Sequence, residues 1–160
     1  MRVGLIADTH GLLRAEAVNA LAGSDCILHA GDVGKPEIIE GLTRIAPVHA
    51  VRGNVDRAGT VSELPERLEL DLAGWRILIV HERPAAGRAP GADVVVFGHS
   101  HLPLVERARD KLWVNPGSAG PRRFRLPVSV GRLELAGRRP EARLEALAVS
   151  PSRRRDGPRG

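Results

Sequence analysis

Apolar residues in the first hundred positions fall into five short runs, each followed by a residue type that binds metal ions. Runs of four or five apolar residues bounded by Gly, Asp or Asn are typical of fully buried strands. They cover residues 3–7, 26–30, 48–51, 77–80 and 94–97, and lead into Asp8-Thr-His10, Gly31-Asp32, Gly53-Asn54, His81 and Gly98-His99-Ser100-His101. Open α/β folds place their sites where such strands end, so the pattern predicts one site at one edge of a sheet.

Helical spacing separates the first three runs. Apolar positions from Leu13 to Leu21 have the periodicity of a helix. A second helix is expected to begin at Pro36, since proline favours the first helical turn. The order strand–helix–strand–helix–strand predicts parallel βαβ units.

The second half of the chain alternates apolar and polar positions instead. Residues 68–72 and 75–80 predict one hairpin, and residues 104–108 and 111–114 predict another. Residues 84–91 look like a connecting segment with room for one helical turn, and residues 128–135 and 142–148 both alternate. We expect these later strands to form a second, antiparallel-rich sheet packed on the first.

The composition fits a single domain, which we place at residues 1–149. A chain of 160 residues with 42% hydrophobic but only 2% aromatic residues must build its core from Val, Leu, Ile and Ala. The chain has no apolar run of 18 residues and enters a strand at once, which predicts a cytoplasmic protein without membrane helix or signal peptide. Cys26, inside an apolar run, is expected to be a buried small hydrophobe.

The net charge of +5 is concentrated at the carboxyl end. Residues 150–160 contain four arginines and one aspartate, which gives +3 and leaves about +2 for the rest. A Pro/Gly/Arg segment without apolar residues buries nothing, so we expect a disordered basic tail there. Arg153, Arg154 and Arg155 in this tail suit contact with RNA or another acidic surface, although a solvated tail needs no function.

Two Asp, one Asn and four His form a mixed set of N and O donors, which suits a pair of transition-metal ions. Asp8 and His10 point to the same side of an extended chain. Asp32 is placed to bridge two cations about 3.5–4 Å apart, as in two-metal hydrolases. Two carboxylates leave two divalent ions with a net positive charge, which favours a phosphate ester and a bridging hydroxide near neutral pH.

Five ordered motifs in roughly residues 1–135 resemble those of the calcineurin-like metallophosphoesterases. They are Asp8-x-His10, Gly31-Asp32, Gly53-Asn54-x-Asp56, His81 and Gly98-His99-x-His101. Asn115-Pro-Gly-Ser118, followed by an Arg/Pro segment, resembles the small single-domain phosphodiesterase branch of bacteria and archaea. The resemblance implies an α/β fold, a four-layer αββα sandwich of two mixed β-sheets flanked by helices. It also implies that the protein forms an oligomer.

The resemblance further implies a ligand assignment and a reaction. Asp8, His10, Asp32 and His101 would hold the first metal, and Asp32, Asn54, His81 and His99 the second. Catalytic roles fall to Asp32, Asn54 and His99. The cofactors would be two divalent ions, Mn²⁺ foremost, with Fe, Zn, Ni or Co as alternatives. The bridging hydroxide would attack the phosphorus of a small phosphodiester substrate in line.

Two positions depart from the family pattern. Many relatives have a histidine after the Asn that protonates the leaving oxygen, and here that position is Val55. General acid help is typically worth about 10²–10⁴-fold, so slow turnover or a good leaving group is expected. Glu82 follows His81 where relatives often have glycine; its carboxylate would add a ligand, repel anionic substrate or face solvent.

Other polar residues near the motifs have alternative roles. His29 and His49 lie inside apolar runs and are expected to be core histidines. Asp56 would orient a ligand or cap the following turn, and Arg52 would steady phosphate or pair with Asp56. Asn115 would contact a ligand histidine or form a plain turn. Substrate-binding candidates are Arg52, Arg122 and Arg123, with Arg125 beside them; a solvated charged loop is the alternative.

Three functions compete. A metal-dependent phosphodiesterase uses the complete ligand set. A metal-binding scaffold or partner-binding protein with little catalysis is the alternative, because the same fold is similar to a retromer scaffold subunit of eukaryotes. Such scaffolds tend to lose part of the first-metal set, whereas His10 is retained here. A nuclease recruited to RNA by the basic tail is a third hypothesis.

Overall fold

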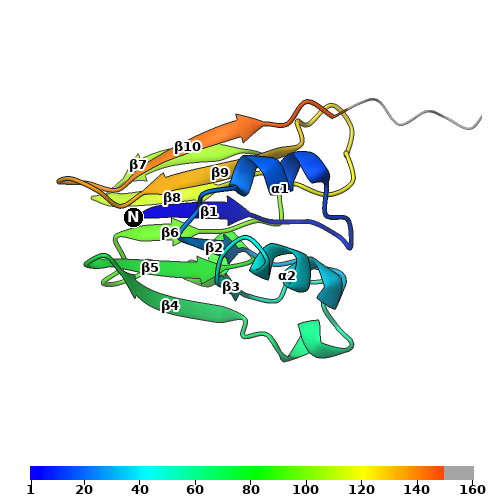
Figure 1. Cartoon of the computed structure of the whole chain (residues 1–160). Helices are drawn as coiled ribbons and strands as arrows, with labels where there is room; N and C mark the ends of the chain where they lie inside the picture. The colour runs from blue at the N-terminus through cyan, green and yellow to red at the C-terminus, as the bar shows by residue number, and fades with distance from the viewer. Residues whose placement is uncertain (150–160) are drawn as a thin grey trace, which may run out of the picture.

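A computed structural model describes residues 1–149 and shows two five-stranded sheets that share one core (Figure 1). The first sheet has the order β10-β9-β1-β2-β3, and the second has the order β4-β5-β6-β8-β7. The strands of the first sheet are β1 (Arg2–Ile6), β2 (Cys26–His29), β3 (Val48–Ala50), β9 (Ser129–Glu134) and β10 (Glu141–Ala146). Those of the second are β4 (Arg67–Leu72), β5 (Trp75–Val80), β6 (Val94–Val96), β7 (Leu104–Ala108) and β8 (Lys111–Asn115).

The parallel βαβ units expected in the first half are confirmed. Strands β1, β2 and β3 are parallel neighbours, and helices α1 (Ala15–Leu21) and α2 (Pro36–Thr43) connect them. Both helices lie in front of the first sheet in Figure 1. Helix α2 begins at Pro36, where the missing N–H of proline breaks no helical bond.

The expected place of the last two strands is wrong. β9 pairs antiparallel with β1, and β10 pairs with β9, so both extend the first sheet. The alternation in residues 128–148 indicates strands with one buried and one exposed face. Such strands fit at the edge of either sheet, so the pattern does not say which sheet they join. The second sheet instead contains the β4–β5 and β7–β8 hairpins around the central strand β6.

Period-two alternation divides the apolar side chains between three layers of core. In β1, Leu5 faces the second sheet, whereas Ile6 packs beneath the helices. In β5, Ile79 faces the first sheet and Leu78 faces outward. The αββα class is therefore confirmed, with a thin fourth layer: the segment around the 3₁₀ turn η2 (Arg83–Ala86) covers the outer side of the second sheet. A second 3₁₀ turn, η1 (Thr60–Glu63), precedes β4.

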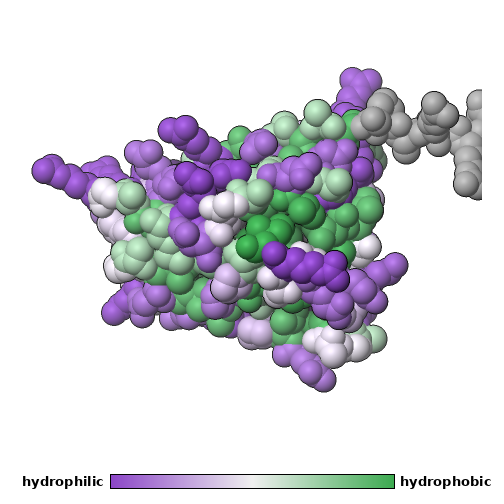
Figure 2. Space-filling model, in the orientation of Figure 1, coloured by the Kyte–Doolittle hydropathy of each residue, from purple (hydrophilic) through white to green (hydrophobic). Residues whose placement is uncertain are grey.

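The surface carries an apolar area surrounded by polar side chains on the face drawn in Figure 2. This area lies between α1 and α2. Cys26 is buried, as expected. Within residues 1–149, no helix is long and apolar enough to span a membrane. The predicted basic tail, residues 150–160, lies outside the described residues.

Replacing Leu28 with alanine tests the shared core. Leu28 is fully buried between the sheets, so a cavity there should lower the free energy of unfolding by about 2–5 kcal/mol in urea titrations. Val105→Ala is the control, because Val105 is 40% exposed and should cost about 0.5 kcal/mol or less. Equal losses in the two variants would contradict the shared core.

Candidate metal centre

The candidate ligands lie where the carboxyl ends of strands from the two sheets come together. Asp8 and His10 follow β1, Asp32 follows β2 and Asn54 follows β3. The remaining three, His81, His99 and His101, follow β5 and β6 of the second sheet. The arrows of β1 and β5 point the same way in Figure 1. The site therefore spans two sheets, and the expectation of one edge of a single sheet is wrong.

Backbone geometry directs these side chains. A positive φ is rare for residues other than glycine and costs of order 1–3 kcal/mol each. The residues beside the strand ends that adopt it are Asp8 (φ 53°), His10 (47°), Asp32 (54°), His99 (71°) and His101 (60°). The left-handed turns change the chain direction at once after each strand. The surrounding structure must therefore hold them in place.

Two motif glycines permit a close approach of the ligand loops. A Cβ atom on Gly53 would lie 2.2 Å from Asp32 Oδ1, and one on Gly31 would lie 2.6 Å from His81 Nδ1. Real Cβ atoms essentially never come so close. Any side chain at these positions would push Asp32 or His81 out of the cluster.

Distances between donor atoms match a coordination polyhedron. Two ligands each about 2.1 Å from one tetrahedral ion lie about 3.4 Å apart. His10 Nε2 and His101 Nε2 are 3.2 Å apart, and His101 Nε2 is 3.5 Å from Asp8 Oδ1. Asp32 Oδ2 is 3.3 Å from His81 Nε2 and 3.7 Å from His10 Nε2. The same oxygen of Asp32 thus faces a histidine of each predicted metal set.

Two groups of side chains are close enough to share an ion, one being Asp8, His10 and His101 and the other Asp8, Asp32 and His81. His81 Nε2 and His101 Nδ1 are buried without a hydrogen-bond partner among the described residues. Buried polar atoms normally have partners, so His81 Nε2, which faces Asp32 Oδ2 at 3.3 Å, points to a missing ligand. His101 Nδ1 is not the ring nitrogen that lies beside His10 and Asp8. The donors therefore fit divalent metal ions; Asp8 belongs to both groups, and Asp32 belongs to one.

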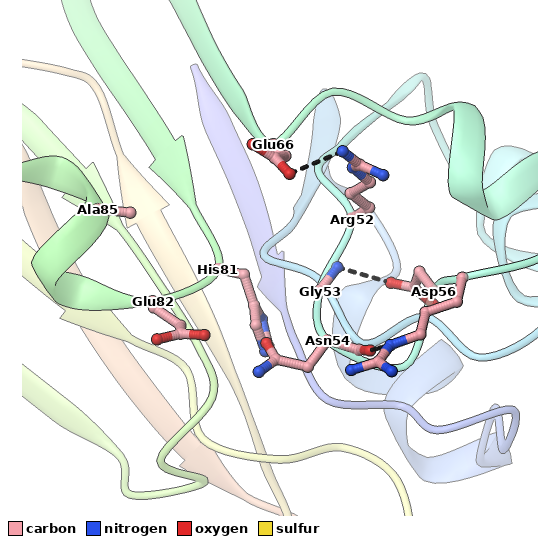
Figure 3. A pocket seen from close by; sticks show the side chains of 9 residues that line it. Arg52, Gly53, Asn54, Asp56, Glu66, His81, Glu82 and Ala85 are labelled. Carbon is pink, nitrogen blue, oxygen red and sulfur yellow. Dashed lines mark hydrogen bonds and ion pairs between the residues drawn. The ribbon is translucent and has the colours of Figure 1, made fainter.

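The two remaining candidates lie at the exposed rim. Asn54 lines a cavity of about 450 Å³ together with His81, and Figure 3 shows both at one side of it. The His99 ring packs edge-on against the His81 ring, with centroids 5.2 Å apart. The His99 backbone N–H also donates to the Asp8 carboxylate, which joins the two sheets. The structure thus brings five candidate ligands into one largely buried cluster and leaves Asn54 and His99 at its exposed rim.

The two carboxylates differ in their protonation. Burial raises the pKa of Asp8 to about 7, and the nearby carboxylate of Asp32 adds to this. Burial also acts to raise the pKa of Asp32, but interactions with His81 and with the Val55 N–H outweigh it and lower that pKa to about 2. Asp32 is therefore ionised at neutral pH, whereas Asp8 is protonated in about half of the metal-free molecules at pH 7.

Two of the imidazoles, those of His10 and His101, favour the neutral form, whereas His81 favours the charged form in the absence of a metal. Burial lowers the pKa of His101 to about 4 and also lowers the pKa of His10. Burial opposes the charged form of His81 as well, but Asp32 and the Ala30 carbonyl raise its pKa overall. His81 Nδ1 donates to the Ala30 carbonyl at 2.8 Å, which leaves Nε2 for a metal.

Asp56 ties the ligand loops together. Its buried carboxylate accepts hydrogen bonds from the backbone N–H groups of Val33, Gly34 and Gly53 at 2.8–3.0 Å. It therefore joins the loop of Asp32 to the loop of Asn54. Neither sequence-based alternative described this role, since Asp56 is hydrogen-bonded to loop backbone on both sides.

Asn115 holds the loop that carries His99. Its Nδ2 donates to the Gly98 carbonyl at 3.0 Å and to Ser100 Oγ at 3.1 Å, and its Oδ1 accepts from the Gly117 N–H. Asn115 thus supports both the histidine loop and its own turn. The predicted direct contact with a ligand imidazole is absent from the hydrogen bonds of the described residues.

Sequence reasoning missed Thr9 and Ser118. Thr9 Oγ1 donates to the Val33 carbonyl and accepts from His29 Nε2, whose other nitrogen accepts from the Gly31 N–H. Ser118 Oγ donates to the Asp8 carbonyl at 2.9 Å. Thr9 lies within Asp8-Thr-His10 and Ser118 within Asn115-Pro-Gly-Ser118, so their place in these motifs could have identified them. His29 is a buried core histidine, as expected, and burial lowers its pKa to about 3.

The other candidates have mixed outcomes. His49 is only partly buried, so the expectation of a core histidine was wrong for it. Arg52 pairs with Glu66 at 2.7 Å, so of its two expected roles the pair with Asp56 is not the one found among the described residues. Arg122, Arg123 and Arg125 are exposed. Beyond the effect of burial, the charge of Arg123 lowers the pKa values of Asp8, His10 and His101, which places it near the cluster.

Comparison with protein families finds a match over residues 1–138 to the calcineurin-like phosphoesterase superfamily domain. A probable metallophosphoesterase of Methanothermobacter thermautotrophicus is 34% identical and aligns over 90% of this chain and 91% of its own. Phosphodiesterase YfcE of Escherichia coli strain K12 is 29% identical, over 84% of this chain and 88% of its own. Vps29 of Chaetomium thermophilum shares the fold, with a TM-score of 0.74, 20% identity, and coverage of 92% and 97%.

Asp56→Ala should loosen both ligand loops. Three backbone N–H groups, of which that of Val33 is buried, would lose a charged acceptor, so we expect the free energy of unfolding to fall by about 3 kcal/mol or more, with weaker Mn²⁺ binding by calorimetry. Asp71→Ala in the exposed part of β4 removes a carboxylate without this role. A loss below about 1 kcal/mol for Asp56→Ala would show that the loops are held by other contacts.

Metal affinity should depend on pH through Asp8. Its pKa of about 7 means that protons compete with Mn²⁺, and His81 adds competition in the same direction. The apparent affinity should fall up to about tenfold per pH unit below pH 7 in calorimetric titrations. In the metal-free protein the raised pKa stabilises the fold fully below about pH 4, and this contribution is lost as the pH rises through 7. A Mn²⁺ affinity that stays the same from pH 5.5 to pH 8 would contradict this coupling.

Proposed function

Because the chain belongs to the calcineurin-like phosphoesterase superfamily, we propose that it is a phosphodiesterase dependent on two divalent metal ions. The observation that carries this proposal is the buried cluster of Asp8, Asp32 and three imidazoles, with donor spacings of 3.2–3.7 Å. Two ions held by these residues would supply Lewis-acid chemistry, lowering the pKa of bound water and stabilising charge on the phosphoryl oxygens.

We assign the ligands as the motifs suggest: Asp8, His10, Asp32 and His101 to one ion, and Asp32, Asn54, His81 and His99 to the other. The position of Asp32 Oδ2 between His10 and His81 supports a shared role for this carboxylate. Its other oxygen accepts from the Val55 N–H at 3.0 Å, which fixes the carboxylate plane. Asp32 therefore keeps its charge and its orientation.

The rim residues suit the handling of substrate. Asn54 and His99 are exposed beside the cavity and the cluster, so a phosphate ester that reaches the ions must pass them. Arg52 lines the same cavity, and the charge of Arg123 acts on the cluster. We propose that Arg52 and Arg123 bind the phosphodiester; the role of Arg122 stays a prediction.

The residue after Asn54 cannot donate a proton to the leaving group. The side chain of Val55, 48% exposed, occupies the position after Asn54 and carries no proton. We therefore propose that the enzyme acts on diesters whose leaving groups depart without a general acid.

A scaffold or partner-binding protein is the second candidate, and the fold shared with Vps29 favours it. Retention of His10 within hydrogen-bonding distance of His101 supports the enzyme instead. Mn²⁺ as the native metal, an oligomeric state and a cytoplasmic location remain predictions. The RNA hypothesis depends on Arg153, Arg154 and Arg155, which lie outside the described residues.

Hydrolysis of bis(p-nitrophenyl) phosphate tests the proposal. Purified protein with Mn²⁺ should release nitrophenolate, and a chelator should abolish the release. Asp32→Ala should lower kcat/KM at least about 10³-fold, since one side chain serves both ions. Two tightly bound ions without turnover under any divalent metal would support the scaffold instead.

A further inference from the structure

The cavity beside the cluster has an unusual charge for a site that receives phosphate. Its charged side chains, besides His81, are Arg52, Arg57, Asp56, Glu66 and Glu82, which is one negative charge in excess. Phosphate sites are commonly lined by arginine and lysine. An acidic excess therefore needs an explanation.

Glu82 accounts for this excess. The other four charged side chains are engaged: Arg52 with Glu66, Arg57 with the Asn54 carbonyl, and Asp56 with three backbone N–H groups. Within residues 1–149, the Glu82 carboxylate has no hydrogen bond or ion pair. Figure 3 shows it on the cavity side of its segment, near His81 and Asn54.

Two simpler roles for Glu82 fit the structure less well. Among the described residues, the groups whose donor atoms are close enough to share an ion do not include it, so it is not placed as a ligand. It is also only partly exposed and lines the cavity, so it is not an ordinary surface carboxylate. The remaining role for the Glu82 carboxylate is that of a negative charge that repels anionic substrate in the cavity.

We propose that Glu82 determines specificity by rejecting dianionic phosphomonoesters and admitting monoanionic phosphodiesters. This inference rests on the proposed function, because it names the substrate class of the same site. A monoester carries close to two negative charges above its second pKa near 6, whereas a diester carries one. The second charge is repelled by Glu82 at short range, in a cavity where solvent screens less than in bulk water.

A charge-neutral variant separates the two substrate classes. With Mn²⁺ at pH 8, Glu82→Gln should raise the ratio of kcat/KM for p-nitrophenyl phosphate to that for bis(p-nitrophenyl) phosphate by about tenfold, or ~1.4 kcal/mol. Both esters release nitrophenolate, so leaving-group chemistry is the same. Glu141→Gln removes a charge from β10, at the opposite edge of the first sheet from β3, and should leave the ratio unchanged. An unchanged ratio in Glu82→Gln would overturn the proposal.

Binding measurements distinguish failure of this inference from failure of the proposed function. If the wild-type protein hydrolyses neither ester, the proposed function fails, and calorimetry with phenylphosphonate and its monomethyl ester still tests Glu82. Glu82→Gln should bind the phenylphosphonate dianion about tenfold more tightly relative to the monoanionic ester. Metal content should match wild type. Loss of metal, an equal change for both phosphonates or no binding of either would overturn the role.

Discussion

The structure depends on holding two buried carboxylates, Asp8 and Asp32, next to each other at the junction of two sheets. Burial raises the pKa of Asp8 to about 7, and repulsion from the Asp32 carboxylate adds to this. Left-handed turns after the strands, the close approach at Gly53 and the hydrogen bonds of Asp56 all maintain this arrangement. Strain and repulsion of this kind persist only where the surroundings, or bound cations, offset them.

That five of the seven candidate ligands lie in one cluster was predictable from sequence, because buried strands and the residues after them follow simple patterns. The strand at residues 77–80 and the histidine after it needed only the apolar run. The partner of β9 was not predictable, since alternation identifies a buried face and not a neighbour. The positive φ of Asp8 and the backbone contacts of Asp56 were equally hidden, because they follow from packing between segments distant in sequence.

Two residues at the rim of the cluster, Val55 and Glu82, bear most directly on the proposed substrate. The two sheets and their core give a rigid frame, and a shared fold does not by itself dictate one role. Here the rim has Val55 without a proton to donate and Glu82 without a partner among the described residues. In the proposed phosphodiesterase, both features would favour diesters with good leaving groups.

Anomalous diffraction from crystals of the Mn²⁺-loaded protein tests the central claim most directly. The account predicts two peaks about 3.5–4 Å apart, with the Asp32 carboxylate in contact with both. It also predicts Asp8, His10 and His101 around one peak and His81 beside the other. A single peak, or two peaks with Asp32 touching only one, would contradict it.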